Sequence, residues 1–264
     1  MSGDGGDELF GGYNRHKLIP DIHKLFGIFP KNVLENFILP SLDNKIINSL
    51  ISKEKSQKLF SSIKSSKDLE EIYYSLTSTG LESDSIFINS NLRKQKFNDI
   101  RLKQITDISE RIMIKDLITY LPFDILVKMD RASMANSLET RTPFLDHRVV
   151  EYAWRIPIET KIYKNGIYKS GKYPLRKILY KYFPKTLFDR KKNGFSFPLN
   201  TWLKGPLKNW ARDIIYSNEI KNQGFIDQEK VYKIWNDHIE NRRDNTSKLW
   251  TILMWQEWIK NWQK

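Results

Sequence analysis

The sequence contains no cysteine. This absence excludes disulfide bonds, thiolate zinc sites and a cysteine nucleophile. Apolar runs long enough to cross a bilayer are also missing, and the acidic, glycine-rich start lacks the basic and then apolar pattern of a secretory signal. The 264 residues are 40% hydrophobic, which is enough to build a core in one large domain or two small ones. We therefore expect a folded protein located in the cytoplasm.

Histidine is scarce, and positive charge is unevenly distributed. The four histidines show no metal-ligand spacing and are expected to be ordinary surface or packing residues. The net charge is +13, and residues 160–192 contain eleven basic residues against one acidic residue, Asp189. Such a segment attracts phosphate-rich partners, although lysines that merely solvate a helix face are the ordinary alternative. Zinc-finger spacing, a basic region leading into heptads and an aromatic RNA-binding signature are absent, which makes nucleic acid an unlikely partner.

Helical periodicity dominates the chain and clear alternating strands are scarce. Apolar spacing predicts helices near residues 46–51 and 69–76, and a stronger helix over 105–121 that ends at Pro122. Residues 173–183 form a helix that starts near Pro174 and stops before Pro184. The tail over 206–264 is helical, with an apolar side that we expect to be core. That side consists of Leu249, Ile252, Leu253, Trp255, Ile259 and Trp262.

The most specific local feature is the N-terminal turn, residues 2–13, with the sequence SGDGGDELFGGY. Three carboxylates, at Asp4, Asp7 and Glu8, lie among glycines, which let backbone N–H groups approach a ligand closely. Carboxylates repel phosphate unless a divalent cation lies between them. They could also orient an amine or act as a general base. An ordinary solvated helix N-terminus remains the alternative reading of this turn.

Two further segments change the interpretation. Residues 124–146 contain DILVKMDRASMA followed by SLETRTPFLD, and residues 171–198 contain GKYPLR followed by DRKKNGFSFP. Together with the N-terminal turn, in this order and at this spacing, they resemble the synthetase half of glutamine-dependent asparagine synthetases. The resemblance extends from residue 2 to about residue 203, and the Trp-rich tail is less diagnostic.

The resemblance implies an AMP-forming carbon–nitrogen ligase of amino-acid biosynthesis. Members of this family use ATP and Mg²⁺ to convert aspartate into a β-aspartyl-adenylate, which ammonia derived from glutamine then attacks. The implied fold is the helical C-terminal part of an α/β adenine-nucleotide α-hydrolase-like (PP-loop) domain. We expect a mainly α chain that lacks most of the parallel sheet, with residues 1–203 as the C-terminal portion of the synthetase domain and residues 204–264 as its Trp-rich helical tail.

The same resemblance assigns roles to individual residues. Ser2 and Gly3 match the backbone contact to the nucleotide. Asp4 matches an acidic catalytic position that could hold or deprotonate the incoming ammonia.

Three other matching positions concern the metal, the leaving group and a supporting segment. Asp7 matches a carboxylate that helps to bind magnesium at the pyrophosphate. Lys172 matches the lysine that neutralises the departing pyrophosphate. Glu139 and Arg141 match an ordered segment beside the site, with a supporting role; a buried Glu–Arg pair that holds a loop is equally compatible.

The sequence also departs from the family pattern. The cysteine nucleophile of the glutaminase domain is absent, as is the pyrophosphate loop of the type SGGxDS. We therefore expect the C-terminal part of a longer or split enzyme, which binds ATP poorly by itself and makes no asparagine. Apolar surface left exposed by the absent strands should favour a partner polypeptide that carries the glutaminase domain and PP-loop, or self-association. Two alternatives remain open: an amidotransferase acting on a surface-polysaccharide sugar, and a non-catalytic basic helical module that binds nucleic acid.

Overall fold

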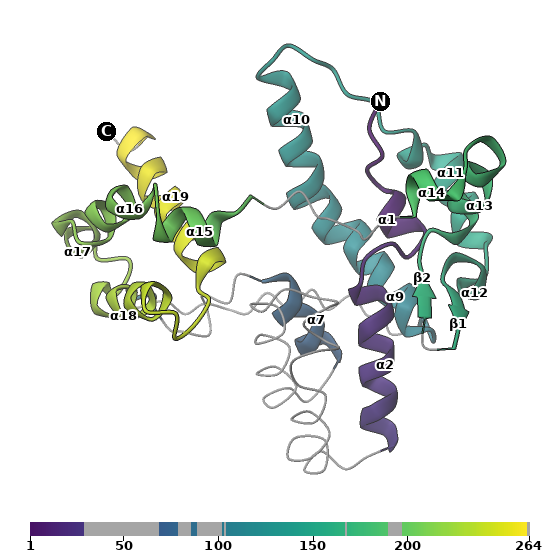
Figure 1. Ribbon diagram of the computed structural model, residues 1–264, viewed down its shortest axis with the longest axis horizontal. Helices are drawn as coiled ribbons and strands as arrows, with labels where there is room; N and C mark the ends of the chain where they lie inside the picture. The colour runs from purple at the N-terminus through teal and green to yellow at the C-terminus, as the bar shows by residue number, and fades with distance from the viewer. Residues whose placement is uncertain are drawn as a thin grey trace. The chain divides into compact units, whose positions relative to one another are not determined.

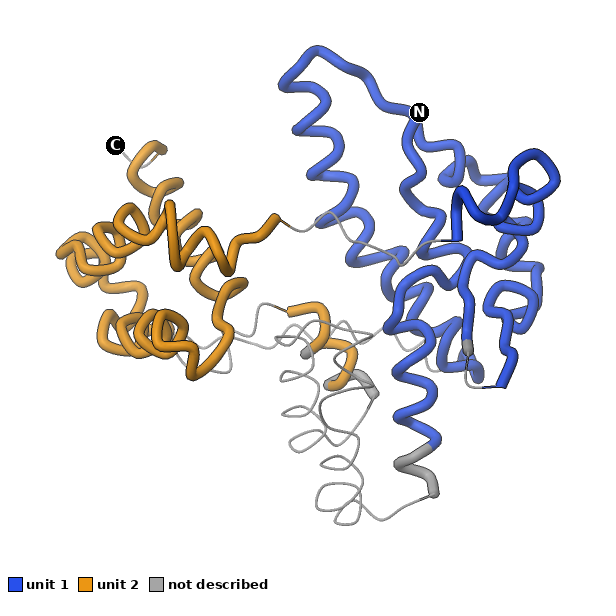
Figure 2. The backbone as a smooth tube through the Cα atoms, viewed as in Figure 1, with its two compact units in different colours: residues 1–41, 97–191 blue, residues 42–96, 192–264 orange. Residues whose placement is uncertain are grey.

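The computed structural model describes residues 1–28, 69–78, 86–88, 102, 104–166, 168–189 and 197–262. Helices make up most of this part of the chain (Figure 1), which confirms the prediction of a mainly helical protein. The chain divides into two compact units, which Figure 2 colours separately. Unit 1 comprises residues 1–41 and 97–191, and unit 2 comprises residues 42–96 and 192–264. The domains expected over residues 1–203 and 204–264 stay a prediction.

The first part of unit 1 consists of helices that pack on one another. Helix α2 packs along α9, and the short α1 contacts both α9 and the π-helix η3 that follows it. Asp107 caps α9, because its carboxylate accepts a hydrogen bond from the backbone N–H of Glu110 at 2.9 Å. The bounds are α1 Gly6–Leu9, α2 Arg15–Ile28, α9 Ile108–Lys115, η3 Asp116–Ile125 and α10 Leu126–Met134.

The expectation that a helix over 105–121 ends at Pro122 is wrong. The helix begins at Ile108, and the chain continues through Pro122 as η3 and then α10. Proline lacks an N–H and its ring clashes with a carbonyl in the preceding turn, which normally ends or kinks an α-helix. Here the turn widens: the N–H of Leu126 donates to the carbonyl of Leu121, five residues earlier. The wider π-turn accommodates the proline without a break.

The second part of unit 1 holds a β-hairpin between short helices. Its strands pair antiparallel, with Tyr163 opposite Ser170. Asp146 caps α11 by accepting a hydrogen bond from the N–H of Arg148 at 2.9 Å. The helix predicted over 173–183 is confirmed as α13. The bounds are η4 Pro143–Leu145, α11 His147–Arg155, α12 Ile158–Lys161, β1 Tyr163–Asn165, β2 Tyr168–Ser170, α13 Tyr173–Tyr182 and α14 Lys185–Phe188.

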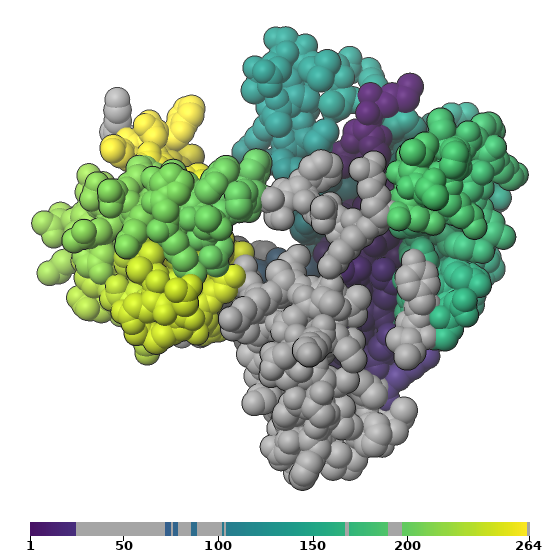
Figure 3. All heavy atoms as spheres, viewed as in Figure 1, coloured from purple at the N-terminus to yellow at the C-terminus, as the bar shows by residue number. Residues whose placement is uncertain are grey.

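Helices α13 and α14 present apolar side chains to solvent. This segment supplies the green atoms at the right of the view in Figure 3. Five large apolar residues of this segment are between 40% and 75% exposed: Ile178, Tyr182, Phe183, Leu187 and Phe188. An exposed group of this kind is typical of a surface that another segment or chain covers.

Unit 2 has an apolar core made by helices that follow one another in the sequence. The buried residues that form this core include Leu203, Ala211, Ile215, Ile220, Val231, Trp235, Leu249, Ile252 and Leu253. Asp227 caps α18 by accepting from the N–H groups of Glu229 and Lys230. The bounds are α7 Leu69–Thr77, α15 Leu199–Lys204, α16 Lys208–Ile215, α17 Asn218–Gln223, α18 Gln228–Ile239 and α19 Thr246–Trp262.

The helical tail and its packing side are largely confirmed. Leu249, Ile252, Leu253 and Ile259 are buried, but Trp262 at the end of α19 is 76% exposed, so its expected place in the core is wrong. The helix predicted near residues 69–76 corresponds to α7, whereas the one near 46–51 lies outside the described residues. Among the helices that the structure describes, none has the length and apolar character needed to cross a membrane.

Candidate functional site

The N-terminal turn folds back on itself around α1. Gly5, with φ of +87°, precedes the helix in the left-handed region, where only glycine is unstrained. Leu9 and Phe10 are buried and anchor the turn in unit 1. The N–H of Gly12 donates to the carbonyl of Asp7 at 2.8 Å, which closes the turn after the helix. The backbone of the turn is thereby fixed relative to the rest of unit 1.

Asp7 and Lys172 form an ion pair at the centre of the candidate site. The Lys172 Nζ lies 2.8 Å from Asp7 Oδ2, and the two side chains are 30% and 22% exposed. Lys172 is the residue before α13 and has a left-handed backbone, with φ of 56°. Its N–H donates to the carbonyl of Phe10 at 2.8 Å. Backbone and side-chain contacts therefore both join this lysine to the N-terminal turn.

Two glycines make this close approach possible. A Cβ at Gly12 would lie 2.0 Å from Asp7 Oδ1 and 2.6 Å from Lys172 Cε, so the ion pair fills the space that a side chain there would take. A Cβ at Gly171 would lie 2.0 Å from the carbonyl oxygen of Gly11. Neither contact is sterically possible, which explains the glycine at each position.

Ser2, Gly3 and Asp4 lie at the beginning of the same turn. The hydroxyl of Ser2 donates to Asp4 Oδ2 at 2.5 Å, and the N–H of Ser2 donates to the carbonyl of Arg141 at 2.7 Å. Gly3 is exposed, and a Cβ there would meet no atom within 4 Å. The structure thus brings Asp7 to Lys172, and ties Asp4 to Ser2.

Glu139 and Arg141 form an ion pair, but not a buried one. The Arg141 Nη2 lies 2.5 Å from Glu139 Oε1, and the side chains are 78% and 70% exposed. The interpretation as a buried pair that holds a loop is therefore wrong. Water screens the charges of an exposed pair, so this one contributes little to stability. The contact of this segment with the turn is instead made by the backbone carbonyl of Arg141.

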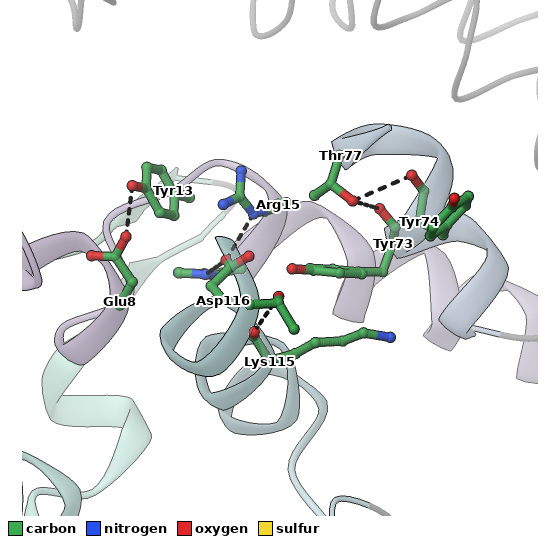
Figure 4. A network of polar contacts seen from close by, with 10 residues as sticks. Glu8, Tyr13, Arg15, Tyr73, Tyr74, Thr77, Lys115 and Asp116 are labelled. Atoms are coloured by element: carbon green, nitrogen blue, oxygen red, sulfur yellow. Dashed lines mark hydrogen bonds and ion pairs between the residues drawn. The ribbon is translucent and has the colours of Figure 1, made fainter. Parts of the chain in front are cut away.

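Sequence analysis missed a buried polar network beside the turn (Figure 4). Arg15 Nε donates to Asp116 Oδ2 at 2.7 Å, and His16 Nε2 lies 2.6 Å from the same oxygen. The Arg15 guanidinium carbon lies 4.1 Å from the ring centroid of Tyr13 and 4.5 Å from that of Tyr120. Asp116 stands at the start of η3, directly after Lys115 and among apolar residues, and this local pattern gives no sign of its partners.

The tyrosine of this network connects it to α1. Tyr13 donates a hydrogen bond to Glu8 Oε1 at 2.8 Å, and Glu8 follows Asp7 directly (Figure 4). Burial raises the pKa of the Glu8 carboxyl despite this hydrogen bond. Burial and the adjacent Glu8 both raise the pKa of the Tyr13 hydroxyl. The third acidic residue of the turn is thus part of the fold's interior, and Asp4 and Asp7 are its partly exposed carboxylates.

The same burial sets the protonation of His16 and Asp116. Burial lowers the pKa of His16, and the hydrogen bond with Asp116 offsets this only in part. For Asp116, burial raises the pKa, but the hydrogen bond from His16 and the charge of Arg15 outweigh it, so the pKa is lowered. His16 is fully buried in this pairing. The expectation that His16 is an ordinary surface or packing residue did not include its contact with Asp116.

The surroundings of the candidate site define what it could hold. In the described part of the chain, no group of three or more His, Cys, Asp or Glu side chains could hold a metal on protein ligands alone. A cavity of about 40 Å³ beside α2, lined among others by His16, Asp21 and Lys169, includes none of the predicted site residues. The site therefore consists of a partly exposed ion pair between the Asp7 carboxylate on the glycine-rich turn and the Lys172 ammonium before α13.

Comparisons with known proteins agree with these motifs. The sequence model of the asparagine synthase family matches residues 1–260. The glutamine-hydrolyzing asparagine synthetase 1 of Bacillus subtilis (strain 168) is 33% identical over 281 residues, covering 98% of this chain and 39% of that protein. Asparagine synthetase 3 of the same organism is 44% identical over 108 residues, or 41% of this chain and 17% of that protein. The asparagine synthetase of Gallus gallus is 42% identical over 96 residues, or 36% of this chain and 16% of that protein.

The chain corresponds to only part of the length of these relatives. The chain spans 39% of the length of the Bacillus subtilis asparagine synthetase 1. No solved structure matches the chain. The match over residues 1–260 nevertheless covers both units and every predicted site residue. The chain belongs to the asparagine synthase family.

Proposed function

We propose that this chain supplies part of the active site of an ATP-dependent ligase that converts aspartate into asparagine through a β-aspartyl-AMP intermediate. The observation that carries the proposal is the Asp7–Lys172 ion pair, at 2.8 Å. Sequence motifs had assigned one residue to a metal-bound phosphate and the other to the leaving pyrophosphate. Those two roles require neighbouring positions, and the two side chains are in contact.

The proposed reaction has two steps in which these residues act. An oxygen of the aspartate side chain attacks the α-phosphorus of ATP, and the bond to pyrophosphate breaks. Lys172 would stabilise the negative charge that develops on the pyrophosphate. Ammonia then attacks the activated carbonyl carbon, AMP leaves, and the nitrogen loses a proton that Asp4 could accept. Ser2 and Gly3 would position the nucleotide through their backbone.

The residues fit Mg²⁺ as an ion shared with the substrate. Magnesium is commonly held by one or two carboxylates together with phosphate oxygens and water. Asp7 is a partly exposed carboxylate beside a glycine whose missing side chain leaves room for the Asp7–Lys172 pair. It would help to hold the ion, which would supply positive charge to the leaving pyrophosphate.

We extend the proposal to the part of the enzyme that longer relatives possess. A parallel sheet with the pyrophosphate loop, and a glutaminase domain as a source of ammonia, would come from a longer form of the chain or from a partner polypeptide. The exposed apolar side chains of α13 and α14 support such a covering segment. Acting alone, the 264 residues would bind Mg-ATP weakly and form no asparagine.

The alternative of a nucleic-acid-binding module finds less support. Several basic residues of the segment 160–192 are used within unit 1. Lys161 is fully buried with its Nζ 4.4 Å from the Trp154 ring, and Lys169 is paired with Asp21. Arg176 forms an ion pair with Asp189 at 3.1 Å. Among the described basic residues of this segment, these three thus have contacts within unit 1, and part of the segment's positive charge is not available to a phosphate backbone.

Reconstitution tests the proposed function. The chain would be mixed with a separately produced polypeptide carrying the glutaminase domain and pyrophosphate loop, and then supplied with Mg-ATP, aspartate and ammonium. We expect aspartate-dependent release of pyrophosphate and formation of asparagine, both abolished by Lys172→Met. The exposed Lys177→Met on α13 serves as the matched control and should leave the rate unchanged. Pyrophosphate release with an acidic sugar but not with aspartate would show that the sugar, and not aspartate, is the substrate that ATP activates. No release with either compound would contradict the proposal.

A further inference from the structure

The Asp7–Lys172 pair neutralises two charges that the proposed function assigns to different ligands. Asp7 is to hold a divalent cation, and Lys172 is to bind a polyphosphate. In the structure each is the ionic partner of the other, at 2.8 Å. Binding of either ligand therefore has to break or rearrange this contact.

The backbone on both sides of the pair is fixed, so any rearrangement falls to the side chains. The N–H of Lys172 donates to the Phe10 carbonyl, and the Lys172 carbonyl accepts from the N–H of Arg176 at 2.9 Å. On the other side, the Asp7 carbonyl accepts from Gly12. The two side chains are partly exposed and free of the constraint of full burial. Rotation about side-chain torsions is the available way to separate the charges.

Neighbouring carboxylates already have other partners. The Asp4 carboxylate accepts a hydrogen bond from the Ser2 hydroxyl, and the Glu8 carboxylate accepts one from the Tyr13 hydroxyl. Asp116 is bound by Arg15 and by His16. Among the described acidic residues, the structure gives Lys172 one ionic partner, and that partner is Asp7.

We propose that the Asp7–Lys172 pair is an electrostatic latch, in which a divalent cation on Asp7 releases Lys172 to bind the polyphosphate. The proposal rests on the proposed function and adds a coupling between its two ligands. By linkage, each ligand raises the affinity for the other to the same extent. A partly exposed ion pair limits this coupling to about five-fold.

Selective acetylation of lysines tests the latch directly. The 264-residue chain is treated briefly with sulfo-NHS-acetate, and modification of each lysine is measured by peptide mass spectrometry with and without Mg²⁺. An amine held by a carboxylate reacts more slowly than a free one, so Mg²⁺ should accelerate modification of Lys172. Asp7→Asn should accelerate it without metal and remove the response to Mg²⁺. Lys169, paired with Asp21 outside the site, is the internal control and should not respond.

Calorimetry supplies a second, independent measurement. Lys172→Met should raise the affinity of the chain for Mg²⁺ by about five-fold, because the lysine ammonium no longer competes with the ion for the Asp7 carboxylate. Asp7→Asn should raise the affinity for metal-free pyrophosphate by a similar factor. Circular dichroism of each variant confirms that it is folded.

The outcomes separate the latch from the function on which it rests. If Mg²⁺ and pyrophosphate both bind but neither variant changes the affinity for the other ligand, the latch is wrong and the proposed function stands. If Asp7→Asn releases Lys172 but neither ligand binds at millimolar concentration, the coupling is overturned and the pair is only a structural contact, and the reconstitution experiment then decides the proposed function.

Discussion

The two compact units of this chain differ in that unit 1 buries carboxylates, whereas the described part of unit 2 buries none. Unit 2 is built on an apolar cluster that includes Leu203, Ile215 and Leu253. Unit 1 buries charged and polar groups close to its candidate site, including Glu8, His16, Asp116 and Lys161. Apolar packing tolerates loss of detail, whereas a buried charge depends on each of its partners. Besides its own buried apolar residues, such as Leu9 and Ile112, unit 1 therefore depends on the partners of its buried carboxylates close to the candidate site.

The largest expected effect comes from removing the charge at the centre of the unit 1 network. Asp116→Asn would leave Arg15 and His16 in the interior without their carboxylate, at a cost of about 4 kcal/mol in the stability of unit 1. Hydrogen exchange measured by mass spectrometry resolves the two units. Asp237→Asn, which breaks an exposed pair with Arg242, is the matched control and should cost less than about 1 kcal/mol. Equal losses in the two variants would contradict the comparison.

Removing apolar packing should affect unit 2 in a complementary way. Leu253 is fully buried, and Leu253→Ala should cost about 3 kcal/mol there, since it removes buried contacts and leaves a cavity. Tryptophan fluorescence during urea unfolding is suited to this measurement, because seven of the eight tryptophans lie from Trp202 onward. The hydrogen-exchange protection of α9 and α11 in unit 1 should stay unchanged. A loss of protection in both units would show that they do not unfold separately.

Two glycine substitutions compare backbone requirements between the units. Gly171→Ala would place a Cβ 2.0 Å from the Gly11 carbonyl oxygen, so the turn and Lys172 must move apart, at about 3 kcal/mol. Gly224 in unit 2 has φ of +68° with open space around it, and Gly224→Ala should cost only about 1 kcal/mol from backbone strain. Urea unfolding measures both costs. Lys172 acetylation should increase in the first variant alone, and an unchanged rate there would show that the turn tolerates the displacement.

The sequence was sufficient for the parts of this molecule that follow regular patterns. The helical tail and α13 between its prolines could be predicted from apolar spacing and proline positions, and the family from the resemblance carried by the N-terminal turn and the two later motif segments. The course of the chain through Pro122 could not, because the π-turn that admits it depends on the packing around η3. Likewise, the role of Asp116 depends on long-range contacts with Arg15 and His16, which leave no periodic trace in a single sequence.

Acidification should weaken unit 1 through its buried ionisable groups. The folded pKa of His16 is lowered, so the unfolded state binds more protons below about pH 6.5, and stability falls with falling pH. Asp116, whose pKa is also lowered, adds a loss as pH falls below about 3.8. Glu8 acts in the opposite sense: its raised pKa contributes stability at low pH, which is lost as pH rises through the folded pKa.

Between pH 7 and pH 5, where Asp116 stays ionised, the histidine contribution is the part of the pH dependence that a His16 substitution removes. We expect unit 1 to lose stability over this interval, because the unfolded chain takes up a proton at His16 that the folded chain does not. Urea unfolding followed by hydrogen exchange at each pH measures the slope. His16→Gln should reduce it, whereas His147→Gln, at an exposed position, should not. The same slope in all three proteins would assign the acid sensitivity to other groups.

The smallest expected effect concerns the exposed pair of Glu139 and Arg141. Its side chains are 70% and 78% exposed, so Glu139→Gln should change stability by less than about 0.5 kcal/mol. The contact that joins this segment to the N-terminal turn is the Arg141 carbonyl, which the substitution leaves in place. Calorimetric titration with Mg²⁺ and pyrophosphate checks for a role in binding. A clear loss of affinity for either ligand in Glu139→Gln would show that the exposed pair takes part in binding. The candidate site would then include Glu139 and Arg141 as well as Asp7 and Lys172.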